Sequence, residues 1–322
     1  MPSRGKRAAR EGVTDAAVRP ILKWAGGKRQ LLPVLRRYYP ARFRRYFEPF
    51  VGSGAVFLDL HNSGRLDGRE VFLSDTNADV IGCYRAVRDD TDAVIAELAR
   101  LQRGHLQGGQ DHFYEVRDER FNPGRRALVP GEAGAAATYS PALAAMLIYL
   151  NRTGFNGLFR VNAEGMFNVP AGRYAKVRIC DAPNLRALAR ALRTPGVHLD
   201  VGPFDRAVAR AGREDFAYLD PPYAPLSRTA HFRSYTADGF GPGQQEALQR
   251  AVLGLAGRGA HVVLSNSVAP DIRALYEDSV EARTAGLTAI RVPARRAINS
   301  RPAGRGAVLE YVITNVATPE VV

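Results

Sequence analysis

The stretch AYLDPPYAPL at residues 217–226 places an acid, two prolines and a tyrosine directly after an apolar run. Proline has a fixed φ angle and no backbone N–H, so Pro221 and Pro222 end the strand and hold the chain rigid. Asp220 and Tyr223 are then displayed at the carboxyl end of a strand, where α/β sheets bind ligands. An ordinary strand-ending turn would be the better explanation of an isolated D-P-P, so the rest of the chain must decide.

A second candidate segment is FVGSG at residues 50–54, where Gly52 and Gly54 would let a ligand approach the backbone closely. The dinucleotide fingerprint needs a third glycine where this chain has Phe57, and no Walker lysine pattern is present, which argues against a pyrophosphate. Asp75 ends the next expected strand, a place from which an acid can hold a ribose diol. These residues suggest an adenosine-like ligand without phosphates, such as S-adenosylmethionine, although the pattern alone is weak.

Composition limits the possible functions. The chain has 322 residues, of which 46% are hydrophobic, as in soluble globular proteins, and no apolar run approaches the ~20 residues that span a bilayer. Two cysteines and six histidines without ligand spacing predict neither a disulfide framework nor a metal site. The net charge of +13 favours a polyanionic partner such as nucleic acid, although an arginine-rich chain can also be basic throughout.

Apolar runs of strand length alternate with helical spacing along the chain. Residues 43–60 are expected to form a strand, a glycine-containing turn and the start of a helix. Further strands are expected at residues 70–75, 197–201, 215–220, 261–265 and 308–315, and helices at residues 78–102, 141–150, 183–193 and 244–257. Residues 103–140, rich in glycine and proline, are expected to be irregular. The alternation predicts an α/β fold with a mostly parallel sheet, interrupted by an insertion at about residues 80–185.

Six motifs, taken in order, resemble one family: KWAGGK (23–28), FEPFVGSG (47–54), LSDTN (73–77), NRTGFNGLFRVNAEGMFNVPAGRY (151–174), YLDPPYAPLS (218–227) and LSN (264–266). The chain resembles the DNA adenine methylase group of adenine-N6 methyltransferases over about residues 20–315. The resemblance implies methyl transfer from S-adenosylmethionine to adenine N6 in duplex DNA, with base flipping. The family's usual target is GATC.

The resemblance also implies the fold and its domains. We expect an α/β, Rossmann-like methyltransferase sheet with an inserted, mainly helical target-recognition domain. Residues 20–80 and 186–322 would form the catalytic domain that binds the cofactor, and residues 81–185 the DNA-binding domain. Residues 1–19 carry charge but no apolar signal-peptide core, so we expect a basic flexible tail.

The residues that the resemblance assigns to the cofactor are Trp24, Lys28, Gly52, Gly54, Asp75, Phe204 and Asp220. Lys28 would lie near the methionine carboxylate, the two glycines beneath the methionine moiety, Asp75 at the ribose and Phe204 on the cofactor adenine. The chain departs from the family pattern at Pro203, where an acid is common, and this puts the contacts at the adenine corner in doubt.

The implied catalytic residues are Asp220, Pro221, Pro222 and Tyr223. The exocyclic amine of adenine is a poor nucleophile because its lone pair is delocalised into the ring. The Asp220 carboxylate and a backbone carbonyl would accept its two N–H groups and aim the lone pair outward, while Tyr223 stacks on the base. The cofactor's sulfonium supplies the driving force.

The residues predicted to contact DNA are Lys23, Arg152, Phe155, Asn156, Leu158, Arg160 and Tyr174, six of them in an expected hairpin over residues 151–174 that is rich in arginine and aromatic residues. Of these, the resemblance offers Lys23, Leu158, Arg160 and Tyr174. Leu158 and Arg160 would read bases, because arginine recognises guanine edges bidentately in the major groove. Aromatic side chains can fill the space that an extruded base vacates. Any one of these arginines could instead contact a phosphate.

Two alternatives remain: a methyltransferase that acts on RNA or protein, and a catalytically silent DNA-binding regulator on the same scaffold. Asp220 and the basic hairpin argue against the first, and the nearly complete motif set argues against the second. The expected partner is double-stranded DNA, with no membrane and no metal. We expect a monomer in the cytoplasm, at the nucleoid of a bacterium or in the host cell of a phage.

Overall fold

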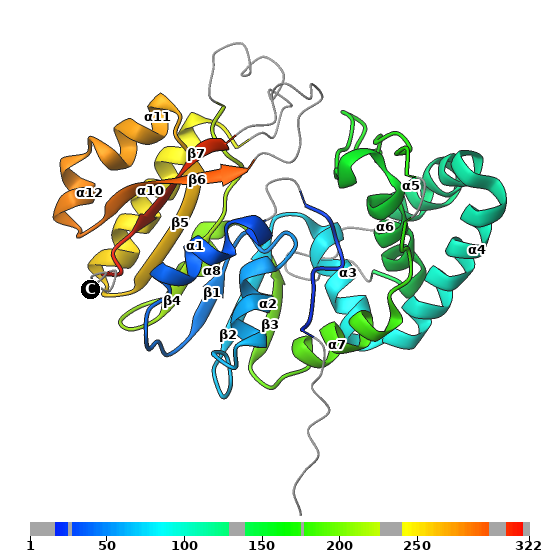
Figure 1. Cartoon of the computed structure of the whole chain (residues 1–322), viewed down its shortest axis with the longest axis horizontal. Helices are drawn as coiled ribbons and strands as arrows, with labels where there is room; N and C mark the ends of the chain where they lie inside the picture. Colours follow the sequence, from blue (N-terminus) through cyan, green and yellow to red (C-terminus); the bar gives the residue numbers. More distant parts are fainter. Residues whose placement is uncertain are drawn as a thin grey trace, which may run out of the picture.

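The computed structural model describes residues 17–24, 28–128, 139–174, 177–225, 240–295 and 307–317. At its centre is a seven-stranded sheet of order β3-β2-β1-β4-β5-β7-β6 (Figure 1). The strands are β1 (Tyr46–Glu48), β2 (Val71–Asp75), β3 (Val197–Val201), β4 (Phe216–Leu219), β5 (His261–Ser267), β6 (Thr288–Arg295) and β7 (Ala307–Thr314). The first five strands are parallel, and β7 runs antiparallel to β5 and β6. The predicted α/β class and Rossmann-like sheet are confirmed, and β6 is a strand that the sequence did not predict.

Helices cover both faces of the sheet and fill one side of the molecule. Short turns precede or follow several of them: η1 (Lys28–Gln30), η2 (Arg36–Tyr38), η3 (Val116–Phe121), η4 (Phe155–Gly157) and η5 (Arg273–Glu277). The α-helices are α1 (Leu32–Leu35), α2 (Ala55–Asn62), α3 (Ala78–Asp89), α4 (Thr91–Glu115), α5 (Asn122–Arg126), α6 (Pro141–Thr153), α7 (Ala182–Leu192), α8 (Phe204–Val208), α10 (Pro242–Gly257), α11 (Pro270–Ile272) and α12 (Val280–Thr284).

The sheet separates two apolar cores because successive side chains of a strand point to opposite faces. In β4, Phe216 and Tyr218 enter the core shared with α2, α3, α4 and α6, whereas Ala217 and Leu219 enter the core beneath α8 and α10. All four β4 side chains are buried, as expected of a central parallel strand. The strand β4 ends at Leu219, directly before Asp220, so the two prolines terminate it as predicted.

The strand order reverses between β1 and β4, since β1 continues to β2 on one side and pairs with β4 on the other. Connections leave in opposite directions at such a switch point and open a crevice at the carboxyl ends of the strands. The loops after β1, β2 and β4 all start there. The loop after β1 carries the glycine segment, the loop after β2 begins directly after Asp75, and the loop after β4 carries the D-P-P-Y segment.

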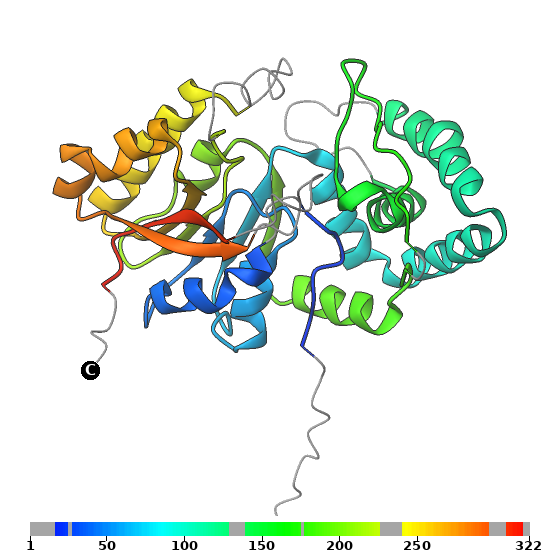
Figure 2. The same cartoon turned by 45° about the horizontal axis from the view of Figure 1, so that its top comes forward.

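The helices α4 and α6 pack together beside the sheet, on the right in Figures 1 and 2. The expectation of an irregular chain beyond residue 103 is wrong for residues 103–126, which are helical. Burial of Leu98, Leu101 and Phe113 outweighs the low helix propensity of the glycines. The helix is kinked at Gly109, which has a non-helical backbone with φ of 52° and ψ of −121°. The part of the expected loop at residues 129–138 lies outside the described residues.

A hairpin over residues 154–174 follows α6, with antiparallel bridges from Gly154 to Ala171 and from Val161 to Phe167. The helical side of the molecule holds it through side chains rather than through a sheet. The Asn122 amide accepts from the Phe167 N–H at 2.8 Å and donates to its carbonyl at 3.0 Å. Arg117 and Arg125 donate to the carbonyls of Val169 and Gly165. Two bridges alone would leave the hairpin marginal, so these contacts set its position.

The predicted domain boundaries after residues 80 and 185 fall inside α3 and α7, which pack against each other, so the division stays a prediction. Residues 1–16 of the predicted tail lie outside the described residues. Val18 exchanges backbone hydrogen bonds of 2.9 Å with the Asn62 amide, so the described chain is anchored before residue 20. No helix among the described residues is long and apolar enough to span a membrane.

Candidate active site

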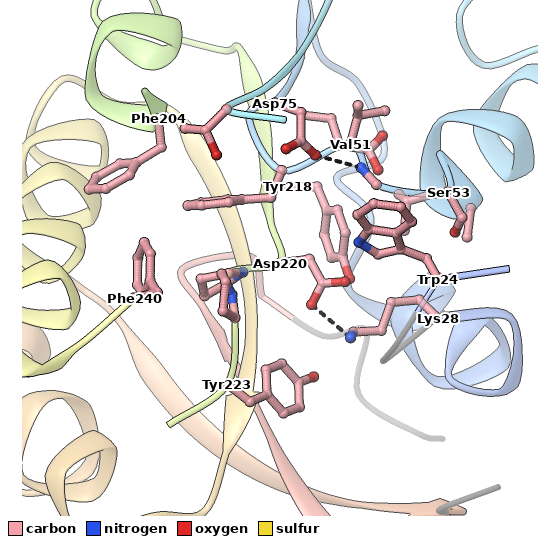
Figure 3. A pocket seen from close by; sticks show the side chains of 18 of the residues that line it. Trp24, Lys28, Val51, Ser53, Asp75, Phe204, Tyr218, Asp220, Tyr223 and Phe240 are labelled. Atoms are coloured by element: carbon pink, nitrogen blue, oxygen red, sulfur yellow. Dashed lines mark hydrogen bonds and ion pairs between the residues drawn. The ribbon is translucent and has the colours of Figure 1, made fainter. Parts of the chain in front are cut away.

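A cavity of about 920 Å³ opens at the carboxyl ends of β1, β2 and β4 (Figure 3). Of the residues predicted for cofactor and catalysis, the following line it: Trp24, Lys28, Gly52, Asp75, Phe204, Asp220, Pro221, Pro222 and Tyr223. Gly54 lies behind the wall, at the amino-terminal end of α2, with φ of 65°. Sequence motifs that are far apart along the chain thus meet at one cavity.

The Asp220 carboxylate is paired with a cation. Its Oδ1 atom lies 2.7 Å from the Lys28 ammonium, and its side chain retains 21% exposure towards the cavity. Burial raises the pKa of Asp220 to about 6, against the opposing effect of Lys28. The group is therefore mostly ionised at neutral pH and can accept hydrogen bonds from a ligand in the cavity.

Two side-chain amides, those of Gln245 and Asn266, fix the segment that follows Asp220. The Gln245 amide of α10 donates to the Pro222 carbonyl at 3.0 Å. Asn266 of β5 accepts from the Ala224 N–H at 3.3 Å and donates to Gln245 at 3.0 Å. Asn266 belongs to the L-S-N motif, so that motif supports the catalytic loop from the neighbouring strand. Gln245 had no signal in the sequence, because only the fold brings α10 beside the loop.

The Asp75 carboxylate joins the loops after β1 and β2. Its Oδ2 atom accepts from the Gly52 N–H at 3.0 Å, and its Oδ1 atom accepts from the Asn77 N–H at 2.9 Å. Burial raises the pKa of Asp75, while these backbone N–H groups oppose the shift. The Tyr84 hydroxyl donates to the Gly52 carbonyl at 2.8 Å, so both backbone groups of Gly52 are held.

Gly52 cannot be replaced without a clash. Its φ is 44°, and an added Cβ would lie 2.7 Å from Cδ1 of Trp24. Only glycine adopts this conformation without strain, and only its missing side chain admits the Trp24 ring. The G-x-G pattern here therefore serves close packing of an indole against the backbone.

Glu48 is a buried acid of the cavity wall that the sequence analysis did not select. Its Oε2 atom accepts from the Tyr46 hydroxyl at 2.8 Å and from the Phe57 N–H at 3.0 Å. Phe57 lies in the first turn of α2, whose N-cap is Gly54 and offers no side chain, so Glu48 takes over the capping role from β1. Burial, with a smaller contribution from Asp220, raises the pKa of Glu48 to about 8. The signal available in the sequence was the acid of FEPF.

Three phenylalanines form the corner of the cavity that lacks the expected acid. Phe204 stacks on Phe50 with ring centroids 5.5 Å apart, and Phe240 lies edge-on to Phe50 at 5.7 Å. Pro203 also lines this corner. Asp205 is exposed and is not among the lining residues, so it does not replace the missing acid. The sequence analysis missed Phe50 and Phe240.

The segment ahead of η1 contacts the hairpin. The Trp24 ring stacks on Phe159 at 5.8 Å between centroids. The Lys23 ammonium lies 4.4 Å from the centroid of Tyr174 and donates to the Arg152 carbonyl at 3.2 Å. The motif that begins at Lys23 therefore connects the cavity wall with the hairpin.

The residues predicted to contact DNA divide into two groups. Phe155 and Tyr174 are exposed on the hairpin, at 44% and 39%, and Asn156 and Leu158 lie beside them in the same turn, partly buried. The exposed Arg160 side chain donates to the side chain and carbonyl of Asn168 across the hairpin, at 2.7 and 3.2 Å.

Arg152 is oriented differently. Its half-buried guanidinium donates to the carbonyls of Ile21 and Arg178 at 3.1 and 3.2 Å. These bonds make it a support for the chain near residue 21, and this arrangement does not favour the predicted contact with DNA. Within the described ranges, no group of three or more potential ligand side chains is arranged to hold a metal ion.

Comparison with known proteins identifies the family. Residues 24–297 match the family described as D12 class N6 adenine-specific DNA methyltransferase. This chain belongs to that family. The type II methyltransferase M.MjaIII of Methanocaldococcus jannaschii is 36% identical over 92% of this chain and 99% of its own. The type II methyltransferase M1.LlaDCHI of Lactococcus lactis is 33% identical over 92% and 95%, and the DNA adenine methylase of Escherichia coli K12 is 35% identical over 77% and 80%.

The D12 family assignment confirms the resemblance that the six motifs indicated. The matched residues include both parts of the chain that line the cavity, from Trp24 to Thr76 and from Pro203 to Gln244, and the helical region between them. The individual site residues remain predictions, because the match identifies the family over residues 24–297 and assigns no role to a single residue.

The raised pKa of Glu48 predicts a pH-dependent stability difference. Its usual pKa is 4.5, so between about pH 5 and pH 8 the folded protein holds a proton that the unfolded chain releases. The free energy of unfolding should then fall as the pH rises, by up to about 1.4 kcal/mol per pH unit. The variant Glu48→Gln keeps an acceptor oxygen but carries no proton that titrates in this range. In urea unfolding, its free energy of unfolding relative to that of the wild type should therefore increase as the pH rises.

The matched control is Glu246→Gln, a substitution at an exposed position on α10, which should follow the wild-type pH curve. Parallel curves for wild type and Glu48→Gln would show instead that Glu48 is ionised in the folded protein.

Proposed function

We propose that this protein transfers a methyl group from S-adenosylmethionine to N6 of adenine in double-stranded DNA, at GATC sites, with the target base flipped out of the helix. The observation that carries the proposal is that the D-P-P-Y segment and the Asp75-held glycine turn face one cavity. An acceptor for an amine and a holder for an adenosine thus lie side by side, in a chain of the adenine-specific family.

The described residues fit S-adenosylmethionine. A cavity of about 920 Å³ lies within the range of small-molecule sites. Asp75 would accept from the ribose hydroxyls with lone pairs that the backbone N–H groups leave available, and the phenylalanine corner at Phe204 would pack on the cofactor adenine. Lys28 would attract the methionine carboxylate. When bound, the cofactor supplies an electrophilic methyl group on a sulfonium.

The cavity's charge also suits a cationic ligand. Asp75 and Asp220 line it, and so does Glu48, whose raised pKa keeps it mostly protonated at neutral pH, whereas Lys28 is the sole basic side chain among the described lining residues. In this structure Lys28 neutralises Asp220. A ligand with both an ammonium and a carboxylate would give each of these two groups a new partner of opposite charge, which leaves Asp220 ready to accept from the amine.

Asp220 would then do the positional work of the reaction. Its carboxylate accepts one N–H of the adenine amine, which directs the nitrogen lone pair towards the methyl group. Pro221 and Pro222 keep the acceptor rigid, and the bonds from Gln245 and Asn266 hold the loop against α10 and β5. Tyr223 provides a ring on which the flipped base stacks.

The DNA would lie across the hairpin and the chain around Lys23. An adenine inside a duplex cannot reach Asp220, so the base must be extruded. Exposed Phe155 and Tyr174 are available to contact unstacked bases, and the bonds to Asn168 preorient the Arg160 guanidinium for a guanine edge. The chain's net charge of +13 favours the phosphate backbone. GATC rests on the motif resemblance. Cytoplasmic location and a monomeric state stay predictions.

A methylation assay tests the function directly. The protein is incubated with S-adenosylmethionine labelled in the methyl group and with a GATC duplex, a duplex of the same composition without GATC, or an RNA duplex. Label should appear as N6-methyladenine in the GATC duplex alone. The variant Asp220→Ala removes the amine's acceptor and should keep less than about 1% of the rate. Labelled RNA, or an Asp220→Ala rate above a tenth of wild type, would contradict the proposal.

Loss of the Asp75 carboxylate should weaken cofactor binding. A charged hydrogen-bonding partner contributes about 1.5–3 kcal/mol, so Asp75→Ala should lower the affinity roughly 10- to 150-fold in titration calorimetry. The matched control is Asp200→Ala on the neighbouring strand β3, where the side chain is 67% exposed, and its affinity should stay at the wild-type value. Unchanged affinity in Asp75→Ala would restrict Asp75 to tying the two loops together.

Arg160→Ala should relax the choice of sequence. A bidentate guanine contact discriminates by about 1–3 kcal/mol, so duplexes with one altered outer base pair should gain relative to GATC. Arg283→Ala removes the same charge from an exposed site on α12 and should leave the ratio unchanged. If Arg160→Ala slows methylation of every duplex equally and reduces the salt dependence by about one charge, Arg160 contacts a phosphate.

A further inference from the structure

Tyr223 of the D-P-P-Y segment has a partner from the other end of the chain. Its hydroxyl donates to Oε2 of Glu310 on β7 at 2.9 Å. Burial, together with the carboxylates of Asp220 and Glu310, holds the pKa of Tyr223 well above its usual value. The hydroxyl therefore stays protonated and remains a donor, and a hydrogen bond to a carboxylate is stronger than one between neutral groups.

The backbone of Glu310 is held on both sides. In the sheet register it lies opposite Ser267 of β5 and opposite Val292 of β6. A side chain that extends from a central strand is a firmer anchor than one from a loop, because the ladder fixes its Cα position. Glu310 does not itself line the described cavity, so its effect on a bound base would pass through Tyr223.

The Tyr223 ring is held from two directions. The Lys28 ammonium lies 4.5 Å from its centroid, and the hydroxyl at the far end of the ring is tied to Glu310. The hydroxyl oxygen lies on the axis of the second side-chain torsion, so the bond to Glu310 fixes where the ring lies, while the Lys28 ammonium against the ring limits rotation about that axis. The position of the ring matters because an offset-stacked base requires a ring at a defined place.

We propose that Glu310 is a positioning residue for methyl transfer, which holds the Tyr223 ring at the place where the flipped adenine stacks. This inference rests on the function proposed above. Asp220 orients the amine of the base, and the Glu310–Tyr223 pair fixes the position of the ring against which the same base stacks. Two different strands, β4 and β7, thereby define the pose of the substrate.

A double-mutant cycle tests the pair. Single-turnover methylation of a GATC duplex is measured for wild type, Glu310→Ala, Tyr223→Phe and the double variant. We expect each single variant to lose about tenfold in rate, and the double variant to be within about twofold of either, because both remove the same bond. The conservative variant Glu310→Gln keeps an acceptor oxygen and should lose less than about threefold. Multiplied losses in the double variant would overturn the proposal.

A matched control separates this effect from general damage to β7. Glu277 of η5 accepts from the hydroxyl of Tyr311, the residue of β7 that follows Glu310. Glu277→Ala should keep the methylation rate within about twofold. The cofactor affinity of Glu310→Ala should likewise stay within about twofold of wild type, since the cofactor contacts proposed above do not include this pair. A tenfold loss of cofactor affinity would contradict the role.

A fluorescence readout does not depend on turnover. With 2-aminopurine at the target position, stacking on Tyr223 quenches the extruded base, and Glu310→Ala should leave it brighter than wild type does. Equal quenching would overturn the proposal. If wild type methylates no DNA, the proposed function fails, and a crystal structure of Glu310→Ala decides whether the Tyr223 ring has moved from its place. If wild type methylates GATC but the cycle is additive, the function stands and the role of Glu310 falls.

Discussion

The concentration of buried carboxyl groups at one edge of the sheet is the constraint on which the rest of the site depends. Burying a carboxylate without compensation is costly, and Glu48, Asp75 and Asp220 line the same cavity. Each is compensated in a different way. Burial favours the protonated form of Glu48, backbone N–H groups solvate Asp75, and Lys28 neutralises Asp220.

These three solutions also build the local structure. The capping bond from Glu48 starts α2, the bonds to Asp75 shape the glycine turn, and the Lys28 pair brings η1 beside the D-P-P-Y segment. Compensation of the charges and construction of the cavity are therefore the same set of contacts. A ligand that carries positive charge enters a wall that is already organised around acids.

Sequence reasoning succeeded where the signal was local. The prolines after β4 and the acid that ends β2 mark strand ends within a few residues, and parallel strands bring such ends together. Gln245 and Glu310 were not predicted because their partners, Pro222 and Tyr223, lie 23 and 87 residues away. Glu48 has both of its partners within nine residues, so a local signal was available and was not used. Arg152 was predicted to contact DNA, and that contact stays a prediction; its bonds to the carbonyls of Ile21 and Arg178 depend on the fold and have no local signal. The helix through Gly104 and Gly109 depended on packing against α6, which no local pattern contains.

Trp24 is the one tryptophan of the chain. Its indole is packed against Gly52 on the cavity wall and stacks on Phe159 of the hairpin. The intrinsic emission of the protein on excitation near the red edge of the absorption band therefore arises from one indole that touches both regions. The native chain thus carries its own optical probe, without any introduced dye, for events at the cavity and at the hairpin.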